Sequence, residues 1–212
     1  FLVLATDDRT AVERQQPLRA SLDWGVELLA PMGRELLARL SVFVGGWTLE
    51  AAEAVVADED LDRSSVLSGI RELAGFSLVL AETMHGGDKR FRYLEAVRQY
   101  AEERLGEPPE GLVQRYLEWV QAFAAQASDK LTGIDQGHWL ERVHAERPNL
   151  RKTCEALMVS QPEAALALAF NIRRYWVRRG PLRSGRRWFE RALEAAPDAA
   201  PTLRCDALNV LG

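Results

Sequence analysis

Arginine side chains are concentrated in one segment of this sequence. Residues 171–191 contain eight Arg and one acidic residue, Glu190, so the segment carries a net charge of +7 in a chain whose net charge is −4. Guanidinium groups bind carboxylates and phosphates through paired hydrogen bonds, so such a surface suits an acidic protein or an anionic effector. The candidate contact residues are Arg174, Arg178, Arg179, Arg183, Arg186, Arg187 and Arg191.

The spacing of these arginines leaves several interpretations open. On a helix, residues four apart, such as Arg183 and Arg187, share a face and repel each other unless an anionic group meets them. They would then dock the acidic loop 58–62 or an upstream domain, or hold a small anionic effector. Alternatively, the face is solvated and the arginine stems cover Trp176 and Trp188. Nucleic acid is disfavoured, because the rest of the chain carries −11 and would repel a long polyanion.

Residues that could support catalysis or metal binding form no recognisable site in the sequence. A phosphate-binding loop of the GxxxxGK[ST] type is absent, and residues 86–89 have neither its spacing nor its hydroxyl. His138, Glu141 and His144 lie three apart on an expected helix, where they drift around the axis, and no fourth ligand is near. There is also no GxSxG nucleophile motif. We therefore expect no catalytic, metal or cofactor-binding residue in this chain, and no enzyme.

Helix signals and chain breaks alternate over the first part of the sequence. Apolar residues spaced three and four apart predict four helices, over residues 18–29, 34–40, 49–56 and 64–75. Residues 45–46 are a pair of glycines that break the chain. Thr48 can cap the third helix, Ser64 or Ser65 can cap the fourth, and Gly75 can end it.

The period of the pattern then changes. Apolar residues over 78–80 and 91–94 flank residues 85–88, whose two glycines can adopt the positive φ of a hairpin turn. A helix follows over residues 95–106. Helices, a β-hairpin and a closing helix are the order of a winged helix, which we place at residues 18–106.

A winged helix raises the possibility of DNA binding, because such folds lay one helix in the major groove. Charge argues against it here. Residues 34–104 contain nine basic and thirteen acidic residues, and the candidate recognition helix 64–75 offers Arg71 offset by Glu72. Binding through counterion release requires several cations that face phosphates. We expect the winged helix to be an inter-domain spacer.

From residue 110 onward every strong signal is helical, and the chain shows the spacing of a tetratricopeptide repeat. A small residue at Gly185 lets two helices approach closely, while Trp176 and Phe189 fill the space beside them. The residues that match the repeat are Ile172, Trp176, Gly180, Gly185, Phe189, Ala192 and Pro197. Residues 208–212 would begin a further unit. The expected fold is therefore mainly α: a winged helix followed by an α-helical, tetratricopeptide-like solenoid over residues 110–212.

Composition places the chain among globular proteins. It has 212 residues, 47% hydrophobic and 27% charged. No apolar run reaches the length of about 18 residues that would span a bilayer, so we expect a cytoplasmic location. Cys154 and Cys205 form no metal or disulfide motif and are expected to be buried free thiols. Because the sequence begins at Phe1, we expect it to be a piece of a longer protein.

Several segments resemble the middle of bacterial signal-transduction ATPases with numerous domains, large regulators of the LuxR and antibiotic-regulatory-protein types. The resemblance covers nearly the whole chain. Its most specific strings are Val42-Phe43-Val44-Gly45-Gly46-Trp47-Thr48-Leu49-Glu50-Ala51-Ala52 and Glu95-Ala96-Val97-Arg98-Gln99-Tyr100-Ala101. Further similar segments are residues 14–20, 23–24, 40–41, 93–94 and 185–193.

The resemblance implies a domain order and a function. An ATPase module comes first in that family and is followed by a winged helix and a tetratricopeptide-like superhelix, so residues 1–17 would be the linker from a missing ATPase module. ATP or ADP and Mg would belong to that module. Related ATPases have a Met-His-Asp motif where this chain has residues 93–95, so direct nucleotide sensing does not carry over. This chain would couple effector or partner binding on the repeats to the nucleotide switch; the alternatives are a stand-alone protein-interaction adaptor or a nucleic-acid binder acting through the Arg-rich helices.

Overall fold

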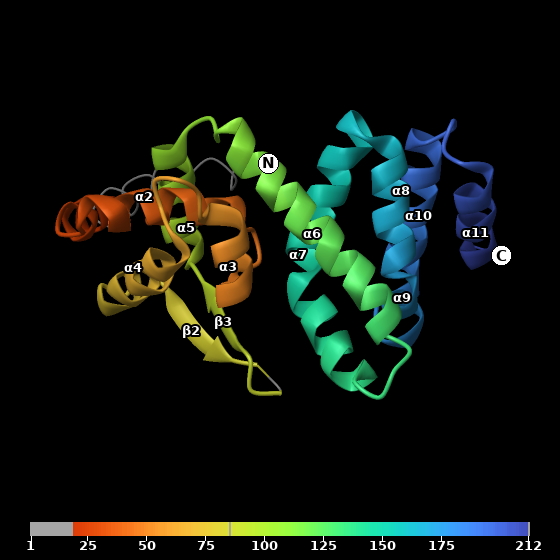
Figure 1. Ribbon diagram of the computed structural model, residues 1–212, viewed down its shortest axis with the longest axis horizontal. Coiled ribbons are helices and arrows are strands. Elements are labelled where there is room, and N and C mark those ends of the chain that lie inside the picture. The colour runs from red at the N-terminus through yellow and green to blue at the C-terminus, as the bar shows by residue number, and fades with distance from the viewer. Residues whose placement is uncertain (1–18, 85, 212) are drawn as a thin grey trace, which may run out of the picture.

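The computed structural model describes residues 19–84 and 86–211 and shows two lobes side by side (Figure 1). The first lobe contains helices and a small sheet, and the second is built from helices alone in the part of the chain described. This confirms the expected mainly α fold, with a β-hairpin confined to the first lobe. The expected linker of residues 1–17, His85 of the hairpin turn and Gly212 of the expected further repeat lie outside the described residues.

The helices of the first lobe begin where local capping groups allow. Thr48 caps α3 as predicted, because its Oγ1 accepts a hydrogen bond from the Ala51 amide at 3.1 Å. The predicted cap of α4 was wrong by two or three residues: the Asp62 carboxylate, not a serine hydroxyl, accepts from the Ser65 amide at 2.8 Å. After residues 19–27, which are helical, the elements are α2 (Pro31–Arg39), η1 (Leu40–Val42), α3 (Leu49–Val56), α4 (Arg63–Gly75) and α5 (Glu95–Leu105).

Helix α4 ends at Gly75, as predicted, although Gly75 does not itself adopt the left-handed conformation. Gly75 is the last helical residue, but the chain reverses beyond it, and the left-handed conformation falls on Ser77 with φ 58°. The Ser77 amide donates to the Ala74 carbonyl at 3.0 Å, and the Leu78 amide donates to the Leu73 carbonyl at 2.9 Å. These bonds satisfy carbonyls at the helix end and lead the chain directly into the hairpin.

The hairpin is present and is joined by a third, short strand. Strands β2 (Leu80–Thr83) and β3 (Lys89–Arg92) pair in antiparallel register, and β1 (Trp47–Thr48) pairs with the other edge of β3. Two residues are too few to produce a strand pattern, so β1 was not predicted. The turn glycines Gly86 and Gly87 have φ of 111° and 91°, as the prediction required.

An aromatic cluster holds the sheet against the helices. Trp47 is fully buried, and its ring centroid lies 4.8 Å from that of Tyr93 and 5.8 Å from that of Phe43. The Tyr93 hydroxyl donates to the Leu37 carbonyl at 2.8 Å, which ties α2 to the residue that follows β3. The tryptophan that follows the glycine pair is therefore a core residue of the first lobe.

The second lobe is an array of packed helices: α6 (Glu110–Lys130), α7 (Gln136–Ser160), α8 (Pro162–Asn171), α9 (Arg173–Arg178), α10 (Leu182–Ala195) and α11 (Pro201–Leu211). Apolar residues at helical spacing on α6 and α7 form its core, and among them Leu112, Tyr116, Phe123, Leu150 and Leu157 are buried. Helix α6 also packs on α3, so it belongs to the interface between the lobes (Figure 1).

Gly185 lets α9 and α10 approach closely, as predicted, and Gly180 lets the chain turn tightly against α9. A Cβ added at Gly185 would lie 2.6 Å from Trp176 Cγ, and one added at Gly180 would lie 2.4 Å from Trp176 Cε3. Both distances are far inside van der Waals contact, so only glycine fits at these positions. Trp176 and Phe189 are buried beside them.

The two cysteines differ. Cys154 is buried as expected, and burial raises the pKa of its thiol to about 12. Cys205 is exposed, so the expectation of two buried thiols was wrong. The reason is that α11 packs on the lobe through other positions, such as the fully buried Ala207. In the part of the chain described, no helix combines the length and the apolar character needed to cross a bilayer.

Candidate anion-binding groove and the interface between the lobes

A groove runs between α7 and α10 on the second lobe. Its volume is about 560 Å³, which is the size of a small-molecule site. Arg147 and Arg151 of α7 line one wall, and Arg187 and Arg191 of α10 line the other. The remaining lining residues are His144, Ala145, Pro148, Glu155, Trp176, Ser184 and Trp188.

The four groove arginines carry more positive charge than the groove neutralises. Glu155 is the acidic residue among those lining it, and its Oε1 lies 3.6 Å from Arg191 Nη1. For Arg147, Arg151 and Arg187 the structure gives no side-chain hydrogen bond or ion pair within residues 19–84 and 86–211. Each helix also places its two arginines four residues apart, so that like charges share a face.

Aromatic rings form the floor and one edge of the groove. Trp176 is buried and Trp188 is half-buried, and their ring centroids lie 5.4 Å apart in an edge-on arrangement. His144 Nδ1 lies 2.9 Å from the Tyr175 hydroxyl. Burial lowers the pKa of His144 below 6.5, and the charges of Arg179 and Arg147 lower it further. The groove therefore combines a flat apolar surface with a positive electrostatic potential.

The seven arginines predicted from the sequence do not form one patch. Arg187 and Arg191 lie in the groove, but Arg183 and Arg186 line a different cavity, beside Val210 of α11. Trp176 separates the two, since it lines both cavities and packs on α10 at Gly185. Arg183 and Arg187 lie one turn apart on α10, as expected, but they line different cavities.

The three remaining arginines of the predicted set are held by the second lobe itself. Arg174 donates to the Ser128 carbonyl at 3.1 Å, and Arg178 donates to Gln136 Oε1 at 3.3 Å. Arg179 forms an ion pair with Glu141 of α7. These contacts hold α9 and the residue after it against α6 and α7.

The acidic loop 58–62, expected as one docking partner for the arginines, is occupied elsewhere. Asp58 Oδ2 lies 2.5 Å from Arg39 Nη1 and 3.4 Å from Arg115 Nη2. Arg115 of α6 also donates to the Val55 carbonyl at 2.8 Å. The loop therefore joins the two lobes through α6, not through α9 or α10.

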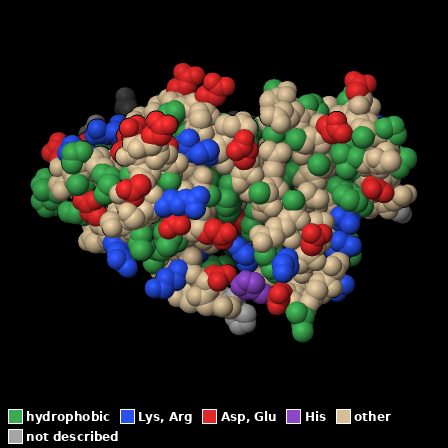
Figure 2. Space-filling view, viewed as in Figure 1, with side chains coloured by type: hydrophobic (Ala, Val, Ile, Leu, Met, Phe, Trp, Pro, Cys, Tyr) green, Lys and Arg blue, Asp and Glu red, His purple; other side chains and the backbone are tan. Residues whose placement is uncertain are grey.

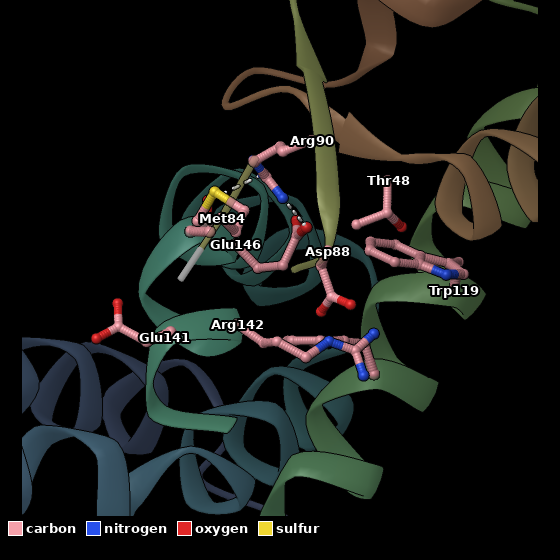
Figure 3. A pocket seen from close by; sticks show the side chains of 10 residues that line it. Thr48, Met84, Asp88, Arg90, Trp119, Glu141, Arg142 and Glu146 are labelled. Carbon is pink, nitrogen blue, oxygen red and sulfur yellow. Dashed lines mark hydrogen bonds and ion pairs between the residues drawn. The ribbon is translucent and has the colours of Figure 1, made fainter. Parts of the chain in front are cut away.

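A buried ion pair forms the centre of the interface between the lobes (Figure 3). Arg90 of β3 reaches across to α7, where its Nη1 lies 2.5 Å from Glu146 Oε1, and both side chains are almost completely buried. Arg90 also donates to the carbonyls of Gly45, Gly46 and Ala145 at 3.0–3.2 Å. Its donors are thus spread over acceptors from both lobes.

Asn149 completes this network one helical turn along α7. Its Oδ1 accepts from the amides of Val44 and Gly45 at 2.9 and 3.3 Å, and its Nδ2 donates to the Gly46 carbonyl at 3.0 Å. The same Nδ2 donates to Glu146 Oε2 at 2.6 Å. The buried side-chain amide of Asn149 therefore provides hydrogen-bond partners for the backbone of loop 44–46.

Both glycines of that loop are required by its surroundings. A Cβ at Gly45 would lie 2.7 Å from Pro148 Cγ of α7, so glycine permits close approach of the lobes. Gly46 has φ 81°, and a Cβ there would lie 2.3 Å from the Phe91 carbonyl oxygen. The cavity left beside this interface is only about 20 Å³, room for about one water. The interface is therefore closed to larger ligands.

The same two turns of α7 serve the groove and the interface. His144, Arg147 and Arg151 face the groove, while Glu146 and Asn149 face the first lobe. Pro148 contributes to both, because it lines the groove and contacts Gly45. Pro148 has no backbone N–H to donate to the carbonyl four positions earlier, so α7 lacks one backbone hydrogen bond at this point.

Sequence reasoning missed most residues of the interface and half of the groove. Arg90, Glu146 and Asn149 lie far apart in the sequence or in ordinary helical positions, and no local pattern singles them out. A proline within an expected helix, at Pro148, was the available signal for an unusual site on α7. Arg147 and Arg151, spaced four apart, repeat on α7 the pattern that drew attention to α10.

The histidines of α7 have structural partners. His138 Nε2 lies 3.4 Å from Asp88 Oδ2 at the hairpin, and His144 contacts Tyr175. Among the described residues no group of three or more metal-ligating side chains comes together. His138 and Glu141 instead stabilise contacts from α7 to the hairpin and to Arg179.

Comparison with known proteins agrees with the geometry of the first lobe. Residues 29–106 match the winged helix-turn-helix domain family. This part of the chain has a winged helix-turn-helix fold. In it α4 occupies the recognition-helix position, and the β2–β3 hairpin is the wing. No solved structure shows a significant match to the chain.

Longer mycobacterial proteins are similar over much of the chain. The "Putative HTH-type transcriptional regulator Rv0890c" of Mycobacterium tuberculosis is 40% identical over 201 residues, covering 92% of this chain and 22% of that protein. The protein named Mb0914c of Mycobacterium bovis shows the same identity and coverage. "Uncharacterized protein Rv0894" of M. tuberculosis is 40% identical over 111 residues, covering 52% of this chain and 28% of its own length. The chain therefore spans less than a third of the length of these relatives.

The winged helix presents little positive charge for nucleic acid. The exposed basic residues of α4 are Arg63 and Arg71. Basic and acidic side chains are interspersed over the face of the molecule shown in Figure 2. The wing is engaged by the second lobe, since Arg90 and Asp88 contact Glu146 and His138 of α7. The wing is thus tied to α7 through two of its side chains.

Proposed function

We propose that this chain is a non-catalytic regulatory region of a transcription regulator. In this role the helical lobe receives an effector or partner, and the winged helix passes the resulting change to the rest of the protein. The observation that carries the proposal is the double use of α7. Residues 144–151 form one wall of a ligand-sized groove and also hold the buried Arg90–Glu146–Asn149 network.

The names of the relatives support the regulatory part of this proposal. Three of them are described as HTH-type transcriptional regulators, and they match this chain over 92% of its length. The winged helix-turn-helix match agrees with such a role. The charge and engagement of the wing favour a spacer between domains.

The finer part of the proposal concerns a nucleotide switch. By resemblance, the parent protein carries an upstream ATPase module that binds ATP or ADP with Mg, and this module is the winged helix's own partner. The chain would then bias a nucleotide-dependent equilibrium without binding nucleotide itself. Cytoplasmic location follows from the same role.

The interface can be tested in the full-length regulator. Asn149→Ala removes the contacts that hold the loop 44–46, while Asn209→Ala makes the same chemical change at an exposed position of α11. We expect the first variant, and not the second, to change the set of transcripts that the regulator controls. Thermal melting of both purified proteins separates a regulatory effect from global unfolding. Unchanged transcripts in a folded Asn149→Ala protein would contradict coupling through α7.

A second candidate function is DNA binding by the winged helix, which the domain match favours. The test is fluorescence anisotropy of a labelled 20-base-pair duplex with and without Arg63→Glu and Arg71→Glu in α4. We expect no salt-sensitive binding by this chain at physiological ionic strength, because too few cations face outward. Binding that both substitutions abolish would establish the winged helix as a DNA reader.

A further inference from the structure

The groove between α7 and α10 has a charged lining and is larger than the two cavities beside α11. It is about 560 Å³, against about 310 and 380 Å³ for the two cavities beside α11. Its lining contains four arginines and one carboxylate, a formal charge of +3 when His144 is neutral. A cavity with such an excess of charge lowers its free energy by taking up an anion.

The positions of the arginines indicate the valence of that anion. Arg147 and Arg151 lie on α7, and Arg187 and Arg191 lie on α10, so each wall offers a pair of guanidinium groups. Each pair consists of like charges one turn apart, which destabilises the free groove and is relieved by a counter-charge. A ligand with two acidic groups could meet both pairs, each through bidentate hydrogen bonds.

The aromatic residues indicate the shape of the rest of the ligand. Trp188 is half-buried at the groove, and Trp176 supports it from below at a centroid distance of 5.4 Å. An indole face of this kind packs well on a flat, apolar group. Ser184 adds a hydroxyl on the α10 side.

We propose that the groove binds a small organic dianion with a flat ring, held between the arginine pairs of α7 and α10 and packed on Trp188. The proposal rests on the regulatory role inferred above, and it assigns the class of effector that the helical lobe receives. Aromatic dicarboxylates and aryl phosphate monoesters share this chemistry. A polyanion such as nucleic acid is not the proposed ligand, because acidic residues predominate outside the Arg-rich segment.

Matched probes test the charge requirement directly. Isophthalate and phenyl phosphate represent the two sources of a ring-bearing dianion, and isophthalamide has the shape of isophthalate without its charge. We expect calorimetric titration of the 212-residue chain to give a Kd on the order of 1 mM for at least one dianion at low salt. The neutral diamide should bind at least about tenfold more weakly, and added salt should weaken the dianion.

Three substitutions locate the site. Arg147→Ala and Arg187→Ala each remove one arginine from opposite walls, and we expect each to weaken dianion binding at least about fivefold. Arg183→Ala makes the same change on α10, one turn away but outside the groove, and should leave the Kd unchanged. Circular dichroism of each variant confirms that the fold is retained.

Several results would overturn the proposal. They are equal binding of isophthalamide, undiminished binding after both groove substitutions, and equal loss after Arg183→Ala. Binding of a 20-nucleotide oligothymidylate through the same arginines, with no binding of either dianion, would assign the surface to nucleic acid instead.

A separate readout distinguishes failure of the site from failure of the regulatory role. The amides of Val44 and Gly45 donate to Asn149, so their hydrogen-exchange rates report on the docked loop. At a dianion concentration near the Kd of the unmodified chain, these rates should change in that chain and change clearly less in Arg187→Ala. A dianion that binds without altering either amide would keep the assigned site but contradict coupling to the winged helix.

Discussion

The two sides of α7 use arginine in opposite ways. On the interface side, Arg90 is buried and its donors are taken by Glu146 and by three backbone carbonyls. On the groove side, Arg147, Arg151 and Arg187 have no side-chain acceptor within the described part of the chain. Both sets of arginines lie on, or face, the same two turns of α7, residues 144–151.

The difference shows how to tell an architectural arginine from one that awaits a ligand. A buried guanidinium must have every donor satisfied, because an uncompensated charge in the interior costs several kcal/mol. An arginine at the wall of an open groove can remain unsatisfied, because water solvates it until a ligand replaces the water. Burial together with the count of acceptors, and not the presence of positive charge, separates the two roles.

The largest expected effect is on the interface side, at the aromatic core that supports the loop 44–46. Trp47→Ala should lower the free energy of unfolding by about 4 kcal/mol, because it empties a fully buried site between Phe43 and Tyr93. Urea denaturation measures this. Trp47→Phe should lower the free energy of unfolding much less, because it keeps an aromatic ring and removes an indole N–H that has no acceptor among the described residues. Equal losses for the two variants would contradict a packing role.

Breaking the buried ion pair should have the next largest effect. Glu146→Ala leaves Arg90 buried without its carboxylate, and we expect a loss of about 3 kcal/mol in the free energy of unfolding. The double variant Arg90→Met with Glu146→Leu should recover most of that loss, because it removes both charges. If Glu146→Ala unfolds at the same urea concentration as the unmodified chain, the pair is not the anchor of the interface.

Substitution of a groove arginine, by contrast, should barely change the free energy of unfolding. Arg187→Ala removes a like-charge neighbour of both Arg183 and Arg191, so its free energy of unfolding should change by no more than about 0.5 kcal/mol. The same denaturation experiment gives the comparison. A loss approaching that of Glu146→Ala would place Arg187 with the architectural arginines and would weaken the case for an anion site.

The smallest effect concerns pH. Burial, then Arg179 and Arg147, hold the pKa of His144 below 6.5, so the folded chain favours the neutral ring more than the unfolded chain does. Its contribution to stability is complete above pH 6.5 and is lost as pH falls toward the folded pKa. A ring-proton NMR titration should show this pKa, and isophthalate should raise it by offsetting the nearby charges. A His144 pKa above 6.5 in the free chain would contradict a positive groove.

Local chemistry explains the elements that the sequence predicted correctly. The apolar spacing of α3, the Thr48 hydroxyl and the turn glycines Gly86 and Gly87 all act through interactions with residues close by in the sequence. Such signals depend on backbone geometry that neighbouring residues share, so they can be read without knowing the fold. Where a second capping group lay nearby, as Asp62 does beside Ser64, the predicted N-cap was two or three residues away from the observed one.

The sequence by itself determined that this chain is mainly helical, that a hairpin interrupts the helices, and that Gly185 allows α9 and α10 to pack closely. Only the tertiary structure decided which arginines meet. Arg147 and Arg187 lie 40 positions apart, and Arg90 and Glu146 lie 56 positions apart. Periodicity identifies the face of a helix that is buried, but it does not identify the neighbour that covers it. That pairing depends on how whole helices pack, and here it placed Arg187 in the groove with Arg147 while Arg183 lines a different cavity.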